Sequence, residues 1–208
     1  MRQFGKLVCS QPIATFCDGQ STAFRPQLGE LLTMLTVGDK FPEYTVDACV
    51  GSDQASLTSL SNADYADTWT VYYFYPKDFT FICPTEIAEF NRQLGEFADR
   101  DCKVVGGSTD NEYSHLAWCQ SHDDLKDLAY PLIGAQKLAQ DLGIVDPAAN
   151  VCLRATFIVD PHGVIQWASA NALSVGRSIP EILRVLDAIQ SDELCPCNWK
   201  KGDPGLDV

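Results

Sequence analysis

Basic residues and histidines are scarce in this chain of 208 residues. Lysine and arginine total 15 against 28 aspartates and glutamates, so the formal net charge is −13, and there are only 3 histidines. A surface this acidic repels phosphate groups and anionic headgroups, which disfavours nucleic acids and membrane surfaces as partners. The sequence also lacks the run of about 18 apolar residues that a membrane-spanning helix needs. We therefore expect a globular protein that binds neither nucleic acid nor membrane.

The cysteines form no CxxC motif and no secretory framework. There are 9 of them, an odd number that cannot pair completely within one chain. Their positions are Cys9, Cys17, Cys49, Cys83, Cys102, Cys119, Cys152, Cys195 and Cys197. The N-terminal residues show no secretory signal pattern. These features are typical of a cytoplasmic protein with mostly free thiols, and the missing CxxC disfavours a thioredoxin-type disulfide reductase.

Patterned sequence begins at the second methionine, Met34. Residues 1–33 are polar, contain prolines and show no sustained period, which is typical of a flexible N-terminal extension or of a start site chosen too far upstream. We expect residues 34–190 to form one domain and residues 191–208 to form a C-terminal tail.

Strand-like and helix-like segments alternate along the expected domain. Runs of β-branched and aromatic residues predict strands over residues 69–75, 102–107, 130–133, 154–159 and 164–168, and a turn at 160–163 joins the last two as a hairpin. Apolar spacings of three and four predict helices over residues 84–100, 111–121 and 179–189. This order favours an α/β fold with a central mixed sheet flanked by helices.

The strongest chemical signal is Cys83, which stands after a strand and a short loop, at the N-terminus of the helix expected over residues 84–100. Unpaired amides and the positive end of the helix macrodipole favour the thiolate there, and the thiolate is the reactive form of cysteine. Thr80 precedes Cys83 by one helical turn, so its hydroxyl could reach the sulfur or an oxygen bound beside it. Pro76 would fix the loop and shield the pocket from water. Position alone also allows an inert, buried cysteine that caps the helix.

Four separated motifs carry a resemblance to a known family. Pro76, Thr80 and Cys83 match the PxxxTxxC signature of the peroxiredoxins, and the longer string FTFICPTEIAEF resembles their typical two-cysteine subgroup. Arg154, in the string RATFIVD, stands where this family has its invariant arginine. Cys195, in the string LCPCNW, stands where the family carries its resolving cysteine. The similarity is greatest to the peroxidase subunit of bacterial alkyl hydroperoxide reductases, in the form with a CxC tail.

The resemblance extends from about Val37 to the C-terminus and implies a thioredoxin-like peroxidase domain followed by a resolving-cysteine tail. It implies that the Cys83 thiolate attacks a peroxide and becomes a sulfenic acid, while Thr80 and Arg154 orient the peroxide and stabilise its shifting charge. Cys195 of the partner subunit then condenses with the sulfenic acid to form an intersubunit disulfide, which a reductant reopens.

The implied substrates are hydrogen peroxide and organic hydroperoxides, and the implied role is antioxidant defence. The resemblance requires no metal and no bound cofactor. It implies a homodimer, which in this family often assembles into rings, and a disulfide reductant that is a thioredoxin-like protein, a flavoprotein or a dithiol adaptor. An alternative from another class is a chaperone or redox relay, in which Cys83 passes oxidation to a client protein. Steady-state peroxide consumption with a recycling reductant distinguishes the two.

Three further residues are possible members of the site, each with a plainer alternative. Cys197 could resolve the sulfenic acid or pass the disulfide outward, or it could be a bystander on the tail. Glu86 could brace an active-site arginine, and as a first-turn glutamate it also complements the helix dipole. Arg177 is either a second arginine near the site or a surface residue.

A metal site is a weaker hypothesis. His115, Cys119 and His122 share one face of the helix expected over residues 111–121, but a fourth ligand is missing nearby, and structural zinc normally has four. We therefore favour an ordinary packed helix. The cysteines outside the family motifs are interpreted as small buried hydrophobic residues or loop thiols: Cys9, Cys17, Cys49, Cys102, Cys119 and Cys152.

Overall fold

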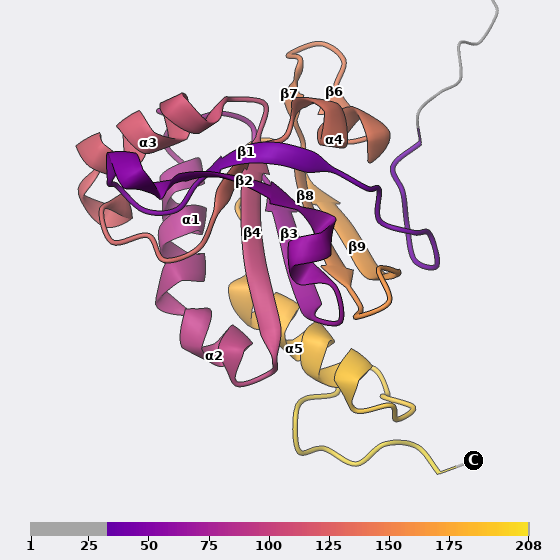
Figure 1. The fold of residues 1–208 in the computed structure, drawn as a ribbon. Helices are drawn as coiled ribbons and strands as arrows, with labels where there is room; N and C mark the ends of the chain where they lie inside the picture. Colours follow the sequence, from indigo (N-terminus) through magenta and orange to yellow (C-terminus); the bar gives the residue numbers. More distant parts are fainter. Residues whose placement is uncertain (1–32, 208) are drawn as a thin grey trace, which may run out of the picture. The chain divides into compact units, whose positions relative to one another are not determined.

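A mixed seven-stranded sheet lies at the centre of the structure (Figure 1), a computed structural model that describes residues 33–207. The strand order is β2-β1-β5-β4-β3-β8-β9. The strands are β1 (Thr45–Cys49), β2 (Leu57–Ser61), β3 (Trp69–Phe74), β4 (Cys102–Ser108), β5 (Leu132–Gly134), β8 (Arg154–Val159) and β9 (Ile165–Asn171). Strands β3, β4 and β5 are parallel, whereas β1, β2, β8 and β9 each pair antiparallel with their neighbours. The expected α/β fold with a mixed sheet is confirmed.

Five α-helices flank this sheet within the described residues: α1 (Cys83–Arg92), α2 (Leu94–Ala98), α3 (Glu112–Ser121), α4 (Gln136–Asp141) and α5 (Ile179–Gln190). Short 3-10 turns lie at Gln54–Ser56, Asn62–Tyr65 and Asp123–Leu125, and a small hairpin consists of β6 (Val145–Asp146) and β7 (Val151–Cys152). No helix of the described residues is long and apolar enough to cross a membrane.

Side chains of β3 alternate between two hydrophobic cores, because successive residues of a strand point to opposite faces of a sheet. Tyr73 packs in the core under α1, α2, α3 and α5. Tyr72 and Phe74 pack in the other core, together with α4 and Phe41 from the segment before β1. Burial on both faces explains why β3 is continuously apolar and aromatic, since a central strand has no solvent-facing side.

Most of the expected elements are present, and the differences lie in short or interrupted segments. The helix predicted over residues 84–100 is divided at Gln93, whose φ of −97° and ψ of 7° end α1 and begin α2. Asn91 is held by Asp127 and Ala129 through its side chain, and Gly95 weakens helix continuation by about 1 kcal/mol relative to alanine. Strands β1 and β2 and helix α4 were not predicted, because each is short and carries a weak hydrophobic period.

The two ends of the chain differ in what can be described. The expected extension over residues 1–33 lies outside the described residues except for its last position, as do Cys9 and Cys17. The tail after α5 contains no helix or strand among residues 191–207, yet its Trp199 is 4% exposed. The Trp199 carbonyl accepts a hydrogen bond from Arg184 of α5 at 3.1 Å, so this part of the tail packs against the helix.

Candidate active site

The carboxyl end of β3 and the start of β8 lie side by side, because these two strands are antiparallel neighbours with Tyr73 opposite Thr156. Cys83 begins α1 after the loop that leaves β3, and Arg154 is the first residue of β8. Residues 71 positions apart in the sequence therefore meet at this edge of the sheet. In open α/β sheets this is also where ligands generally bind.

Cys83 is fully buried, at 0% exposure, and its Sγ lies 3.4 Å from Nη1 of Arg154. The helix starts tightly, since the amides of Thr85 and Glu86 donate to the Ile82 carbonyl at 3.0 and 3.3 Å. The sulfur thus sits at the positive end of α1 and against a guanidinium. Reactive cysteines are typically found in such electropositive surroundings.

Glu86 connects the two arginines of the site. Its Oε2 accepts a hydrogen bond from Arg154 Nη1 at 2.6 Å, and its Oε1 accepts one from Arg177 Nη1 at 2.7 Å. The three side chains are only 3–4% exposed. One carboxylate therefore lies between two buried cations, and the guanidinium of Arg154 is held in place by a charge-assisted bond.

Arg177 is a buried structural partner of this cluster rather than a surface residue. Its Nε donates to the Thr156 hydroxyl at 2.8 Å, its Nη2 donates to the carbonyls of Phe74 and Ala155, and its guanidinium lies 5.2 Å from the centroid of the Tyr73 ring. Burial lowers the pKa of Arg177, and the charge of Glu86 opposes that shift. The side chain thus ties the ends of β3 and β8 to α1.

The loop between β3 and α1 is held by a buried hydrogen-bonded group. Asp78 accepts from the Tyr75 hydroxyl at 2.9 Å, and its other oxygen lies 2.7 Å from Nδ1 of His115. Nε2 of His115 lies 3.1 Å from the Ile133 carbonyl. Phe79 follows with a φ of 55°, an uncommon value for a residue other than glycine. Such strain persists only where surrounding contacts impose it.

Thr80 does not have the helical spacing to Cys83 that the sequence suggested. Helix α1 begins only at Cys83, and the Thr80 hydroxyl donates to the carbonyl of Lys77 at 2.9 Å. The oxygen keeps its lone pairs free to accept another hydrogen bond. Pro76 is half-buried and starts the same loop directly after Tyr75.

The two tail cysteines lie elsewhere in the chain. Cys195 is half-buried against the end of α5, where its Sγ is 3.5 Å from the Ser191 hydroxyl and 3.7 Å from the Ala188 carbonyl. Cys197 is exposed. Among the described residues, neither cysteine contacts Cys83.

The residues considered for a metal do not converge. His115 uses both ring nitrogens within the protein, Cys119 is buried, and His122 lies just beyond α3, where its Nδ1 accepts from the Asp124 amide at 3.3 Å. In the part of the chain that the structure describes, no group of three or more His, Cys, Asp or Glu side chains is placed to hold a metal ion.

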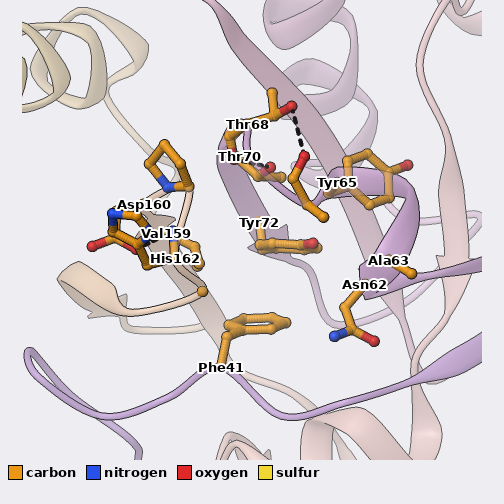
Figure 2. A pocket seen from close by; sticks show the side chains of 13 residues that line it. Phe41, Asn62, Ala63, Tyr65, Thr68, Thr70, Tyr72, Val159, Asp160 and His162 are labelled. Carbon is orange, nitrogen blue, oxygen red and sulfur yellow. Dashed lines mark hydrogen bonds between the residues drawn. The ribbon is translucent and has the colours of Figure 1, made fainter.

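A separate cavity of about 190 Å³ lies on the opposite face of the sheet (Figure 2). Its floor is aromatic, with Phe41 and Tyr72 stacked at a centroid distance of 4.2 Å, and Tyr65 and His162 lie at its sides. The cavity has no cysteine in its lining, so it is not part of the cluster around Cys83.

The buried His115 makes stability depend on pH. Burial by itself lowers the pKa of His115, but the hydrogen bond and charge of Asp78 outweigh it, so the pKa lies above its ordinary value. A raised folded-state pKa stabilises the fold below about pH 6.5, and this contribution is lost as pH rises through the folded-state pKa. This titration gives the free energy of unfolding a slope against pH. We expect His115→Gln to remove up to about 1.4 kcal/mol per pH unit from this slope, measured by urea unfolding between pH 6 and 9. An unchanged slope would contradict the charged Asp78–His115 pair.

Sequence comparison assigns the family. The family model described as "AhpC/TSA family" matches residues 37–168. The chain belongs to this family. "Alkyl hydroperoxide reductase C" of Mycolicibacterium smegmatis is 48% identical over 188 residues, covering 85% of this chain and 96% of the relative. "Peroxiredoxin tpx1" of Schizosaccharomyces pombe is 38% identical over 183 residues, covering 84% and 94%.

Solved structures of the family have the same fold. The structure titled "Mycobacterium bovis AhpC" superposes with a TM-score of 0.74 at 44% identity, covering 81% of this chain and 99% of that one. The reduced 2-Cys peroxiredoxin of Plasmodium vivax gives a TM-score of 0.76 at 32% identity, covering 81% and 91%. The resemblance to peroxiredoxins, the thioredoxin-like fold and the assignment as a thiol peroxidase are confirmed.

Sequence reasoning missed several members of the cluster. The Thr156 hydroxyl holds Arg177, and the Leu173 carbonyl holds Arg154 by accepting a hydrogen bond from its Nε at 2.7 Å. Asp78 orders the loop between β3 and α1. A hydroxyl within the apolar run of β8 was an available signal, because a buried polar side chain needs a partner. The Leu173 carbonyl gave no such signal in the sequence, because its role depends only on the tertiary fold.

Proposed function

We propose that Cys83 is the peroxidatic cysteine of this thiol peroxidase and that it reduces hydrogen peroxide and small organic hydroperoxides. The observation that carries the proposal is the buried Cys83 sulfur at the N-terminus of α1, 3.4 Å from the Arg154 guanidinium. This arrangement places the sulfur beside a fixed cation, where peroxide oxygens would develop charge.

The first step oxidises Cys83. The thiolate attacks one peroxide oxygen, the O–O bond breaks, and the departing oxygen takes a proton to become water or an alcohol, which leaves a sulfenic acid on the sulfur. Nε and Nη1 of Arg154 are engaged by Leu173 and Glu86. Within the described residues Nη2 has no hydrogen-bond partner, so it is the donor available to a peroxide oxygen. The Thr80 hydroxyl and Pro76 would complete and shield the pocket.

The second step forms a disulfide with Cys195 of the partner subunit. Two observations support an exchange between subunits: Cys195 packs against α5 in its own chain, and β9 is an edge strand whose outer side has no pairing strand among the described residues. We propose a homodimer that pairs through β9. The exposed rings of Phe79 and Phe81, at 60% and 94%, support a further contact that assembles dimers into rings.

We place the reaction in the cytoplasm, as part of antioxidant defence. A thioredoxin-like protein, a flavoprotein or a dithiol adaptor would reopen the disulfide, and no metal or bound cofactor takes part. The free state of all seven cysteines within the described residues agrees with a reducing compartment.

The tail cysteines give the test of the proposed cycle. After one equivalent of hydrogen peroxide, wild type should migrate as a covalent dimer on a non-reducing gel. Because Cys195 is the resolving cysteine of this proposal, Cys195→Ser should lose most of the dimer, while Cys197→Ser should keep it. The reverse pattern would make Cys197 the resolving cysteine. Rapid peroxide consumption without a dimer in any variant would contradict the intersubunit disulfide.

A further inference from the structure

The loop between β3 and α1 has one buried anchor. Asp78 is 5% exposed, whereas Lys77 and Phe79 on either side of it face solvent. Among the described residues, Asp78 also makes all the hydrogen bonds that join residues 76–81 to the rest of the chain, since the Thr80 hydroxyl bonds within the loop. The path of this loop therefore depends on the groups that hold Asp78.

Three separate parts of the fold converge on Asp78. Its Oδ1 accepts from the Tyr75 hydroxyl at 2.9 Å, directly after β3, and its Oδ2 lies 2.7 Å from Nδ1 of His115 in α3. Its backbone amide donates to Asp110, between β4 and α3, at 2.8 Å. Asp110 is itself held by the Ser108 hydroxyl at 2.9 Å. Both carboxylate oxygens and the amide of this one residue are thus engaged.

His115 is the rigid member of this group. Its side chain is 0% exposed, and its Nε2 lies 3.1 Å from the Ile133 carbonyl of β5. A carbonyl and an ionised carboxylate can only accept hydrogen bonds, so each ring nitrogen of His115 carries a proton. The ring is therefore fixed at both ends, and it cannot turn away from Asp78 without breaking a charge-assisted hydrogen bond.

The two sides of the candidate site are held independently of each other. Arg154 is fixed by Glu86 at 2.6 Å, on the side of β8 and α1. Thr80 takes its position from the loop, because its hydroxyl donates to the Lys77 carbonyl at 2.9 Å and so closes a turn around Asp78. The hydrogen bonds that fix the arginine do not reach the threonine.

We propose that the Asp78–His115 pair positions Thr80 and Cys83 for the reaction with peroxide, so that α3 sets the geometry of the site from outside the cluster around Glu86. The inference rests on the proposed role of Cys83 as the peroxidatic cysteine. His115 acts through Asp78 and is a positioning residue. Its effect on rate follows because the sulfur, the hydroxyl and the guanidinium must be aligned with the peroxide, and a displacement of about 1 Å costs up to about 100-fold in rate.

The test isolates the peroxide step in the full chain. Cys195→Ser and Cys197→Ser together form the parent protein, in which oxidised Cys83 stops at the sulfenic acid. Reaction with hydrogen peroxide is quenched at set times with catalase and dimedone, and the dimedone adduct at Cys83 is quantified by mass spectrometry. The same protein is separately alkylated with iodoacetamide, which needs the thiolate but no aligned peroxide.

The readout is the ratio of the two second-order rate constants at Cys83, peroxide over iodoacetamide. A variant that only exposes, hides or ionises the sulfur differently changes both rate constants and leaves their ratio near that of the parent. A variant that misplaces the groups around the peroxide lowers the ratio. The ratio thus separates positioning from a general loss of structure.

Variants of the pair should lower this ratio to different extents. We expect Asp78→Ala and His115→Gln each to lower it at least about tenfold, because both remove the link from α3 to the loop. Asp78→Asn should stay at least about threefold above Asp78→Ala. Its amide oxygen still accepts from Tyr75, and its amide nitrogen can donate to Nδ1 of a neutral His115.

Two tyrosine variants give a matched comparison that loses only one hydroxyl. Tyr75→Phe removes a donor to Asp78 and should lower the ratio at least about threefold. Tyr44→Phe removes the buried hydrogen bond of 3.1 Å to Tyr72 in the other core and should leave the ratio unchanged. Tyr75→Phe therefore carries the test even if Asp78→Ala does not fold.

The proposal is overturned if His115→Gln and Tyr75→Phe, with native circular dichroism, keep the ratio of the parent. Equal losses in Tyr75→Phe and Tyr44→Phe would overturn it as well, and so would Asp78→Asn falling as far as a folded Asp78→Ala. A failure of the proposed function looks different, because Cys83 of the parent would then form no dimedone adduct with peroxide although it is alkylated.

Discussion

Replacing Cys83 by Ser is expected to lower kcat/KM for hydrogen peroxide by at least about 10⁴-fold, because loss of the nucleophile removes the only step that breaks the O–O bond. A serine hydroxyl at this position keeps the size of the side chain, but it does not ionise near neutral pH and cannot form a sulfenic acid. The buried site is preserved, since Arg154 remains held by Glu86 and the Leu173 carbonyl. The measurement is peroxide consumption in the steady state with a recycling dithiol.

The matched control is Cys152→Ala, a buried cysteine of β7 that packs in the core on the other face of the sheet. Its peroxidase activity should match that of the wild type at a temperature where both are folded. Residual activity of Cys83→Ser within about tenfold of the wild type would refute Cys83 as the peroxidatic residue. The same assay separates a peroxidase from a redox relay, because a relay would consume little peroxide in the absence of a client.

Removing the charge of Glu86 is expected to have the largest effect on stability. Glu86→Gln keeps the shape of the side chain but leaves the guanidinium groups of Arg154 and Arg177 buried without their shared carboxylate, at side-chain exposures of 4% and 3%. Breaking a buried ion pair from one side costs about 3–5 kcal/mol, because it leaves uncompensated charge in the interior. Urea unfolding should show this loss as a lower midpoint with an unchanged slope. Activity should fall too, since Arg154 is no longer oriented toward Cys83.

Glu89→Gln is the control for Glu86→Gln on the same helix. Glu89 pairs with Arg92, whose side chain is 71% exposed, so this ion pair faces solvent. Exposed pairs contribute at most about 1 kcal/mol, and Glu89→Gln should therefore unfold close to the wild type. Equal losses of unfolding free energy in the two variants would show that α1 tolerates neither substitution. The bridging role of Glu86 would then be wrong.

The strands and helices with a strong hydrophobic pattern could be predicted from the sequence. The run from Trp69 to Phe74 forms a strand because its aromatic and β-branched side chains are buried on both faces of the sheet, and Ile182 and Leu186 face the core from α5. Cys83 at a helix N-terminus was also predictable, because Pro84 favours the first turn of a helix. Short strands such as β1 were not predictable, since pairing with neighbours rather than local propensity stabilises them.

The sequence by itself determined the family, the central strands and helices, and the residue types of the candidate site. Only the tertiary structure decided how those residues meet. Arg154 and Arg177 converge on Glu86 because β8 returns antiparallel beside β3, and Thr80 turns toward Lys77 because the loop is held through Asp78. Local sequence encodes backbone preference over a few residues, whereas contacts between distant segments depend on sheet order and helix packing, which form only when the whole core is buried.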